Sequence, residues 1–242
     1  MSIRTRLLLL VFAVWLPALA GFGLLARSTY LHETEAATQH IRDLARSSSF
    51  VVDSELDKRA AVAWTLGAAR SLKEGDMHRF YEHAKRATEG TGNTVLVVDA
   101  TRQVLNTRRP FGAPMPARGW LTDPPLVSGA PIVTDLLTSR VSGAPVITVL
   151  APEPGVEAQR LNIGVAFGPE VIQHVMDMQK FPDGAVAAVL DGKLQTVARN
   201  KDPRKWLGTR AASATVAAAA SGKLDRVFES SSREGAPTVA FM

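Results

Sequence analysis

Cysteine is absent from the 242-residue chain, and its absence excludes several kinds of chemistry. Without thiols the protein has no disulfides, no thiolate zinc sites, no cysteine nucleophile and no lipid-modified cysteine. No serine lies in a nucleophile-elbow context, and no glycine-rich phosphate loop is present. His78 and His83 share a predicted helix but are five residues apart, a spacing that does not place two metal ligands on one face. We therefore expect no catalytic residues, no metal site and no cofactor.

The sequence also lacks a concentrated run of basic residues. Lysine and arginine exceed aspartate and glutamate by 28 to 23, which gives a net charge of +5. This excess is spread along the chain, and basic clusters such as Arg108-Arg109 and Arg204-Lys205 are only two residues long. A nucleic-acid-binding surface needs a basic stripe that follows the phosphates. We therefore expect no nucleic-acid partner.

Apolar residues are plentiful, at 46% of the chain, and the longest uncharged run lies at the N-terminus. Arg4 and Arg6 precede it, it extends from Leu7 to Ala26, and Arg27 closes it. About 20 apolar residues in a helix span the hydrocarbon core of a bilayer. The leading arginines favour a cytoplasmic N-terminus. The sequence thus predicts a transmembrane anchor in the inner membrane, with the bulk of the chain in the periplasm.

A cleaved signal peptide is the alternative interpretation of this segment. Leu7–Leu16 suits the apolar core of such a peptide, and Ala18-Leu19-Ala20 is similar to a small-residue cleavage site. Gly21–Ala26 remains apolar where a polar region would be expected, which favours the uncleaved anchor. Both interpretations place the chain from residue 28 onward outside the cytoplasm.

A long helix is predicted directly after the anchor, from Ser28 to about Leu72, because the segment has no proline and no glycine before Gly67. Apolar residues recur in it at steps of three and four, the period of an amphipathic helix. They are Ile41, Leu44, Val51, Val52, Leu56, Val62, Leu66 and Ala69. Such a stalk could use this stripe for its own core or for a homodimer, and the sequence leaves both open.

The rest of the chain alternates predicted helices and strands. Asp76 is suited to cap a helix through Ala87, and Pro169 to begin one through Met178. Short β-branched runs predict strands over Thr94–Asp99, Gln103–Arg108, Ile132–Leu136, Val146–Leu150, Leu161–Phe167, Ala185–Asp191 and Leu194–Arg199, with later strands beginning at Val227 and Val239. A loop rich in proline and glycine covers residues 110–131 and is long enough to be a binding loop. The fold class predicted is α+β.

One pattern of residues occurs twice. Val95–Asp99, a polar turn, a second strand and Phe111-Gly112 are matched 92 residues later by Val186–Asp191, Gly192-Lys193, a second strand and Trp206-Leu207-Gly208. The pattern indicates two copies of one helix-and-hairpin unit, and the second copy is incomplete. Asp99 and Asp191 occupy equivalent strand ends, where we expect them to accept backbone hydrogen bonds of the turns.

These stretches, together with Ile132–Leu150 and Phe181–Gly208, resemble the double Cache (PAS-like, periplasmic) sensor domains of bacterial receptors such as sensor histidine kinases. The resemblance covers nearly the whole chain. It implies an anchor over residues 1–27, a long helix with a membrane-distal unit over 28–180, and a truncated membrane-proximal unit over 181–242. It also implies two antiparallel sheets flanked by helices, a ligand pocket in the distal unit and dimers through the long helices.

Six residues of the distal unit are candidates for the ligand site. Asp135, in a predicted strand, is the first choice, because such receptors often place an aspartate on a comparable strand, and an ion pair with Arg108 or Arg140 is its alternative role. The full set is Asp135, Arg108, Trp120, Tyr81, Arg140 and Thr148. The arginines suit a carboxylate, and the aromatic rings suit a pocket wall.

The function predicted is extracytoplasmic sensing of a small molecule, such as an amino acid or carboxylate, with ligand binding relayed through the long helix. The alternative is a membrane-anchored periplasmic scaffold or adaptor that binds a partner protein.

Overall fold

A computed structural model describes Trp15, Phe22 and residues 38–99, 101–115, 129–153, 161–222, 227–231 and 237–241. The chain divides into two compact units. One comprises Arg46–Ala217, and the other comprises Met1–Ala45 with Ala218–Met242. The larger unit, Arg46–Ala217, contains the features that bear on function.

Residues 38–67 are helical, as the three-and-four spacing predicts. Within the larger unit this helix buries Val52, Ala63 and Leu66, so part of its apolar stripe serves the core of its own chain. It is followed by α2 (Arg70–Lys73) and α3 (Met77–Ala87). Gly75 takes a positive φ between them. The predicted cap is confirmed, because the carboxylate of Asp76 accepts a hydrogen bond from the backbone N–H of Arg79 at 2.9 Å.

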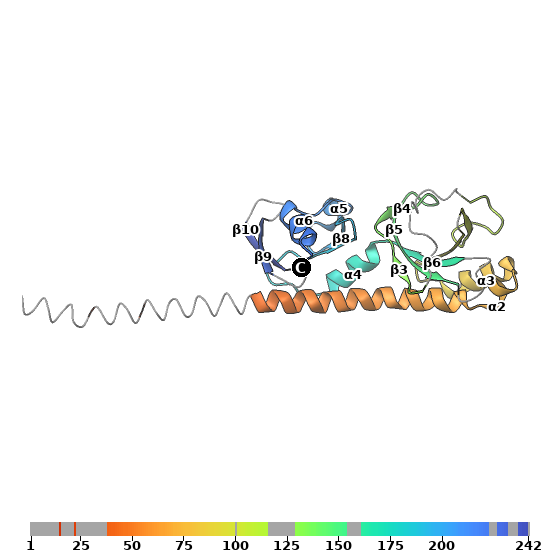
Figure 1. The fold of residues 1–242 in the computed structure, drawn as a ribbon, viewed down its shortest axis with the longest axis horizontal. Helices are drawn as coiled ribbons and strands as arrows, with labels where there is room; N and C mark the ends of the chain where they lie inside the picture. The colour runs from red at the N-terminus through yellow and green to blue at the C-terminus, as the bar shows by residue number, and fades with distance from the viewer. Residues whose placement is uncertain are drawn as a thin grey trace, which may run out of the picture. The chain divides into compact units, whose positions relative to one another are not determined.

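A six-stranded antiparallel sheet follows (Figure 1). Its strands are β1 (Thr94–Val98), β2 (Gln103–Asn106), β3 (Ile132–Val133), β4 (Leu137–Thr138), β5 (Pro145–Pro152) and β6 (Asn162–Phe167). The order is β2-β1-β6-β5-β3. Strand β4 pairs with the beginning of β5, and β3 pairs with a later part of the same strand. The two central strands, β1 and β6, are almost entirely buried, which explains their runs of consecutive apolar residues.

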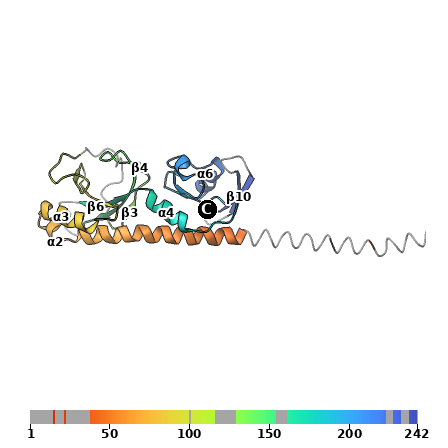
Figure 2. The same ribbon diagram turned by 180° about the vertical axis from the view of Figure 1, so that it is seen from behind.

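The two faces of this sheet differ. Val95, Val97 and Val165 point to one face, where they pack with Leu66 of the long helix and Phe80 of α3. Figures 1 and 2 show both helices on the same side of the sheet. The opposite face carries the alternate residues of the same strands, and a small cluster of Leu96, Val98, Leu150 and Ala166 covers part of it.

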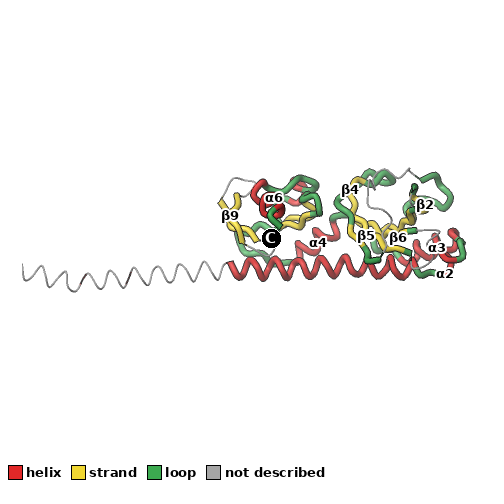
Figure 3. Tube along the Cα trace, in the orientation of Figure 1, coloured by secondary structure: helices red, strands yellow, loops and turns green. Residues whose placement is uncertain are grey.

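A second, smaller hairpin follows α4 (Glu170–Met178) and is formed by β7 (Ala188–Leu190) and β8 (Thr196–Arg199). Gln173 of α4 joins it to the rest of the unit. The Gln173 side chain accepts a hydrogen bond from the Arg199 N–H and donates one to the Arg199 carbonyl, both at 3.0 Å. The short helix α5 (Pro203–Trp206) then packs beside β8. Figure 3 colours the chain by secondary structure, with helices in red, strands in yellow and loops in green.

Near the C-terminus, α6 (Ser213–Ala220) is followed by β9 (Val227–Ser231) and β10 (Pro237–Phe241). These two strands pair with each other in a separate antiparallel sheet. Among the described residues no helix is both long and apolar enough to cross a bilayer. The predicted anchor, Leu7–Ala26, lies outside the described residues except for Trp15 and Phe22. The division at residues 27 and 180 stays a prediction.

Two details of the sequence prediction were wrong. The strand expected over Ile132–Leu136 is interrupted, because β3 ends at Val133 and β4 begins at Leu137. The N–H of Leu136 donates to the Asp191 carboxylate at 3.0 Å instead of to a neighbouring strand. The helices α5 and α6 were not predicted, since neither has an apolar stripe long enough to show a period.

Candidate functional site

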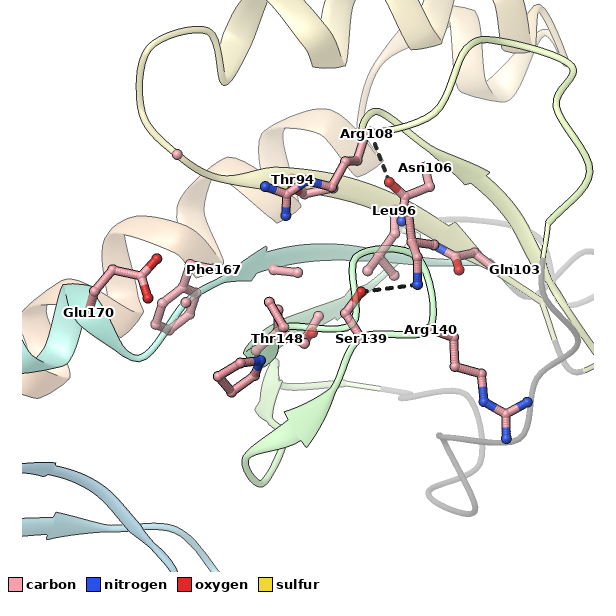
Figure 4. Close-up of a pocket in the computed structure, with 17 residues that line it drawn as sticks. Thr94, Leu96, Gln103, Asn106, Arg108, Ser139, Arg140, Thr148, Phe167 and Glu170 are labelled. Atoms are coloured by element: carbon pink, nitrogen blue, oxygen red, sulfur yellow. Dashed lines mark hydrogen bonds between the residues drawn. The ribbon is translucent and has the colours of Figure 1, made fainter. Parts of the chain in front are cut away.

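A cavity of about 160 Å³ lies on the face of the six-stranded sheet opposite the helices. Strands β1, β2, β5 and β6, the turn between β4 and β5, and the start of α4 all contribute to it (Figure 4). The polar side chains that line it are Thr94, Gln103, Asn106, Arg108, Ser139, Arg140, Thr148 and Glu170. The cavity therefore combines a sheet floor with loops at its rim.

Small side chains make room for this cavity. Thr94, Ala166 and Thr148 are direct partners across β1, β6 and β5, so they form one row on the sheet. In the next row Gly164 lies between Leu96 and Leu150. A Cβ atom on Gly164 would come within 2.5 Å of the Leu96 side chain and 3.0 Å of Thr148. Glycine is thus required at 164 because the Leu96 side chain lies across its backbone.

Two residues that line the cavity, Thr148 and Gln103, carry buried polar atoms with no hydrogen-bond partner among the described residues. The Thr148 hydroxyl belongs to a side chain that is 0% exposed, and the Gln103 side chain is 2% exposed. Within the described part of the chain, neither the Thr148 Oγ1 nor the Gln103 Nε2 makes a hydrogen bond. Burying a polar group without a hydrogen bond costs about 1–3 kcal/mol. A ligand with complementary groups would remove that cost.

Charged side chains stand at the rim, where they are exposed. Arg108 follows β2, Arg140 lies in the β4–β5 turn, and Glu170 begins α4. A Cβ atom on Gly168 would collide with both carboxylate oxygens of Glu170, so glycine at 168 lets that carboxylate fold back over the backbone. In Figure 4, Arg140 extends away from Thr148, toward the side opposite Glu170. The rim thus offers two cations and one anion.

Three of the six residues singled out from the sequence line this cavity: Arg108, Arg140 and Thr148. They come from β2, a turn and β5, and the sheet brings them together. Trp120 lies outside the described residues.

Asp135 and Tyr81 have other surroundings, and neither is among the described residues that line the cavity. Asp135 lies in the break between β3 and β4 and forms an ion pair with the Lys193 amine at 3.4 Å. Tyr81 is buried against the core of α3 and β1. Its hydroxyl donates to the carbonyl of Arg109 at 2.9 Å. Both side chains therefore have structural partners, and their contact with a ligand stays a prediction.

Sequence reasoning missed Gln103 and Asn106, which are three residues apart yet line the same cavity. A period of two would place them on opposite faces. Asn106 pairs with Leu96, whereas Gln103 pairs with Val98, because a bulge at Val104 shifts the register. The available signal was two amides in a short strand of apolar neighbours.

No protein-family model matches the chain, and no curated protein sequence matches it. Solved structures do. The ligand-binding domain of the Campylobacter jejuni chemoreceptor Tlp3 in complex with L-valine is 13% identical, with a TM-score of 0.58 over 83% of this chain and 85% of that one. The extracellular domain of mmHK1S-Z2, assigned as a histidine kinase, is 13% identical, with a TM-score of 0.60 over 83% and 89%.

The ligand-binding domain of the Pseudomonas fluorescens chemoreceptor CtaA in complex with L-serine is 9% identical, with a TM-score of 0.55 over 88% of this chain and 89% of that one. At identities this low, the structural similarity shows a shared fold. The chain therefore has the fold of the ligand-binding sensory domains of chemoreceptors and histidine kinases, as its resemblance to double Cache sensor domains predicts.

Proposed function

We propose that the chain is the extracytoplasmic small-molecule-sensing region of a signal-transduction receptor, with its ligand in the cavity on the six-stranded sheet. The observation that carries this proposal is that two polar atoms of cavity-lining residues, Thr148 Oγ1 and Gln103 Nε2, have no hydrogen-bond partner in the part of the chain that the structure describes. Native structures leave few buried polar groups unsatisfied. A bound ligand is the simplest partner for two such groups whose residues line one cavity.

The chemistry of the cavity fits a small molecule with a carboxylate, such as an amino acid. Arginines at the rim, Arg108 and Arg140, suit a carboxylate, and Glu170 suits an amine. The amide nitrogen of Gln103 donates a hydrogen bond and so requires an acceptor on the ligand. The structural neighbours support this class, since Tlp3 is bound to L-valine or isoleucine and CtaA to L-serine.

Anchoring, dimerisation and relay belong to the same proposal. The apolar run before residue 28 would anchor the chain in the inner membrane. The long helix is the element that would carry a ligand-dependent change toward that anchor, and homodimers would form through it. A ligand can bias two states of such a receptor only by its different affinity for each of them.

A thermal-shift screen of the full chain against the twenty amino acids, small carboxylates and polyamines tests the proposal. Binding raises the melting temperature by mass action, and saturation at 100 times Kd is worth about 2.7 kcal/mol. Thr148→Val is the informative variant, because valine keeps the shape and removes the hydroxyl. We expect the unliganded variant to be more stable by about 1 kcal/mol, and its ligand-induced shift to be smaller than that of the wild type.

Asp135→Ala serves as the matched control. If the cavity is the site, this variant is less stable but keeps the ligand-induced shift. Loss of the shift in Asp135→Ala with retention in Thr148→Val would instead place the ligand at Asp135. A folded chain whose melting temperature no compound changes would count against sensing and in favour of the scaffold alternative.

A further inference from the structure

Arg59 is a buried arginine on the long helix, with only 7% of its surface exposed. A buried charge must be paired and hydrogen-bonded, and Arg59 meets this condition through several contacts. Its Nη1 donates to the Glu55 carbonyl at 2.7 Å and to the Glu55 carboxylate at 3.0 Å. These contacts hold the guanidinium along its own helix.

The same side chain also contacts two segments of the sheet region. Its Nε donates to the Asn93 side-chain oxygen at 3.2 Å. Its guanidinium carbon lies 4.3 Å from the centre of the Phe167 ring, within the range of a cation–π interaction. Asn93 precedes β1, and Phe167 ends β6, so one residue of the helix joins the beginning of one central strand to the end of the other.

Both segments form one end of the cavity. Gly92 and Thr94, the neighbours of Asn93, line it, and so do Phe167 and Gly168. Arg59 itself is not among the described lining residues. It therefore lies behind the cavity wall and holds the two segments of that wall to the helix.

We propose that Arg59 is a positioning residue that sets the shape of this end of the ligand cavity and ties it to the long helix. The proposal rests on the proposed function, because it assumes that this cavity is the ligand site. A displacement of Gly92–Thr94 or of Phe167–Gly168 then alters the contacts of Arg59 and so reaches the long helix. The predicted relay thereby starts at one residue.

Hydrogen exchange of the unliganded full chain, followed by mass spectrometry, tests the positioning role. Arg59→Met removes the hydrogen bonds and the charge but keeps a long side chain. We expect the amides of residues 92–95 and 165–170 to exchange about tenfold faster in this variant, since local opening is governed by the contacts of the segment. The amides of β2 and β3 should keep their wild-type rates.

Lys58→Met is the matched control. The Lys58 amine also pairs with the Glu55 carboxylate, at 2.6 Å, but its side chain is 67% exposed. We expect this variant to leave both segments unchanged. Arg59→Lys should give intermediate rates, because one amine cannot serve Glu55, Asn93 and the Phe167 ring together. Asn93→Ala, which leaves the helix intact, should speed exchange at 92–95 only.

Two results would overturn the proposal. Unchanged exchange at 92–95 and 165–170 in Arg59→Met would show that the arginine does not position these segments. Uniformly faster exchange over β1–β6 would show a role in overall stability alone. No ligand is present in the experiment, so its outcome is separate from that of the ligand screen.

Discussion

The two hairpins of the larger unit are built alike but differ in what surrounds them. In β1–β2 the register shifts between Val97 and Val98, and in β7–β8 it shifts between Val189 and Leu190, 92 residues later. A residue after the second strand accepts a hydrogen bond from the equivalent backbone N–H in each: Thr107 Oγ1 from Val95, and Asn200 Oδ1 from Ala187, both at 2.9 Å.

The bulge in each hairpin places two buried polar residues on one face. They are Gln103 and Asn106 in the first hairpin and Thr196 and Arg199 in the second. In the first hairpin these residues line the ligand cavity. In the second, the Arg199 guanidinium lies 4.8 Å from the centre of the Trp206 ring. One local structure thus leads to a hollow in one place and to a filled position in the other.

The neighbouring elements therefore determine whether such a hairpin borders a cavity. On its far side β1 pairs with β6, and β5 continues the sheet, so that Thr94, Ala166 and Thr148 form one row of small residues. Among the described residues β7 and β8 form a sheet of two strands only, and α5 brings an aromatic ring against it. Substitutions in each region should therefore have different effects on stability.

The largest effect is expected in the core beneath the first sheet. Phe80 of α3 is fully buried against Val95 and Val97. Phe80→Ala should lower the free energy of unfolding by about 3–5 kcal/mol, because it leaves a cavity that the sheet and the helices cannot close. Chemical denaturation of the variant measures this loss. A loss below about 1 kcal/mol would mean that the sheet does not depend on the helices for its core.

Removal of the Trp206 ring should leave a hollow beside the second hairpin, as there is beside the first. Trp206→Ala takes the ring from Arg199 and should cost about 2 kcal/mol, less than for Phe80 because the indole is only half-buried. Lys205→Ala is the control, since the Lys205 amine, which lies 4.7 Å from the centre of the Trp206 ring, belongs to an exposed side chain and should matter little. A loss in Lys205→Ala as large as in Trp206→Ala would contradict the filling role of the ring.

Substitution of the two turn aspartates should lower the free energy of unfolding by amounts that differ less. Asp99 accepts hydrogen bonds within its own turn, from the backbone of Thr101 and Arg102 at 2.7 Å each and from the Thr101 hydroxyl. Asp191 accepts two in its turn and a third from Leu136 in the break between β3 and β4. We expect Asp191→Ala to cost about 1 kcal/mol more than Asp99→Ala, as thermal unfolding of both variants would measure. Equal losses would mean that the Leu136 hydrogen bond contributes nothing.

The smallest effect is a pH dependence at Asp99. Burial opposes its ionisation, but hydrogen bonds from Thr101 and Arg102 outweigh burial and hold the pKa of Asp99 below its usual value. Because the folded pKa is the lower one, its stabilisation is present above the unfolded pKa of about 4 and is lost as the pH falls through the folded pKa. The stability difference between the wild type and Asp99→Asn should therefore shrink below about pH 4. A difference that grows on acidification would contradict the sign.

Much of this architecture could be predicted from the sequence because it is local. The stripe from Val51 to Ala69 indicates a helix with one buried face, Asp76 marks the start of α3, and the β-branched runs mark the strands. The repeated Asp99 and Asp191 identify the two hairpins, and both aspartates accept turn hydrogen bonds as expected. Each of these features depends on residues close together in the chain.

The site depended on tertiary structure. Arg108, Arg140 and Thr148 were identified from residue type, but only the sheet order, in which β1 and β6 lie between β2 and β5, brings them to one cavity. The break after Val133 places Asp135 beside Lys193, and the bulge at Val104 turns Gln103 into the cavity wall. The helices and strands are specified locally, by short-range periodicity and turn chemistry. Which polar side chains line a common cavity depends on strand register and bulges, which are set by residues far apart in the chain.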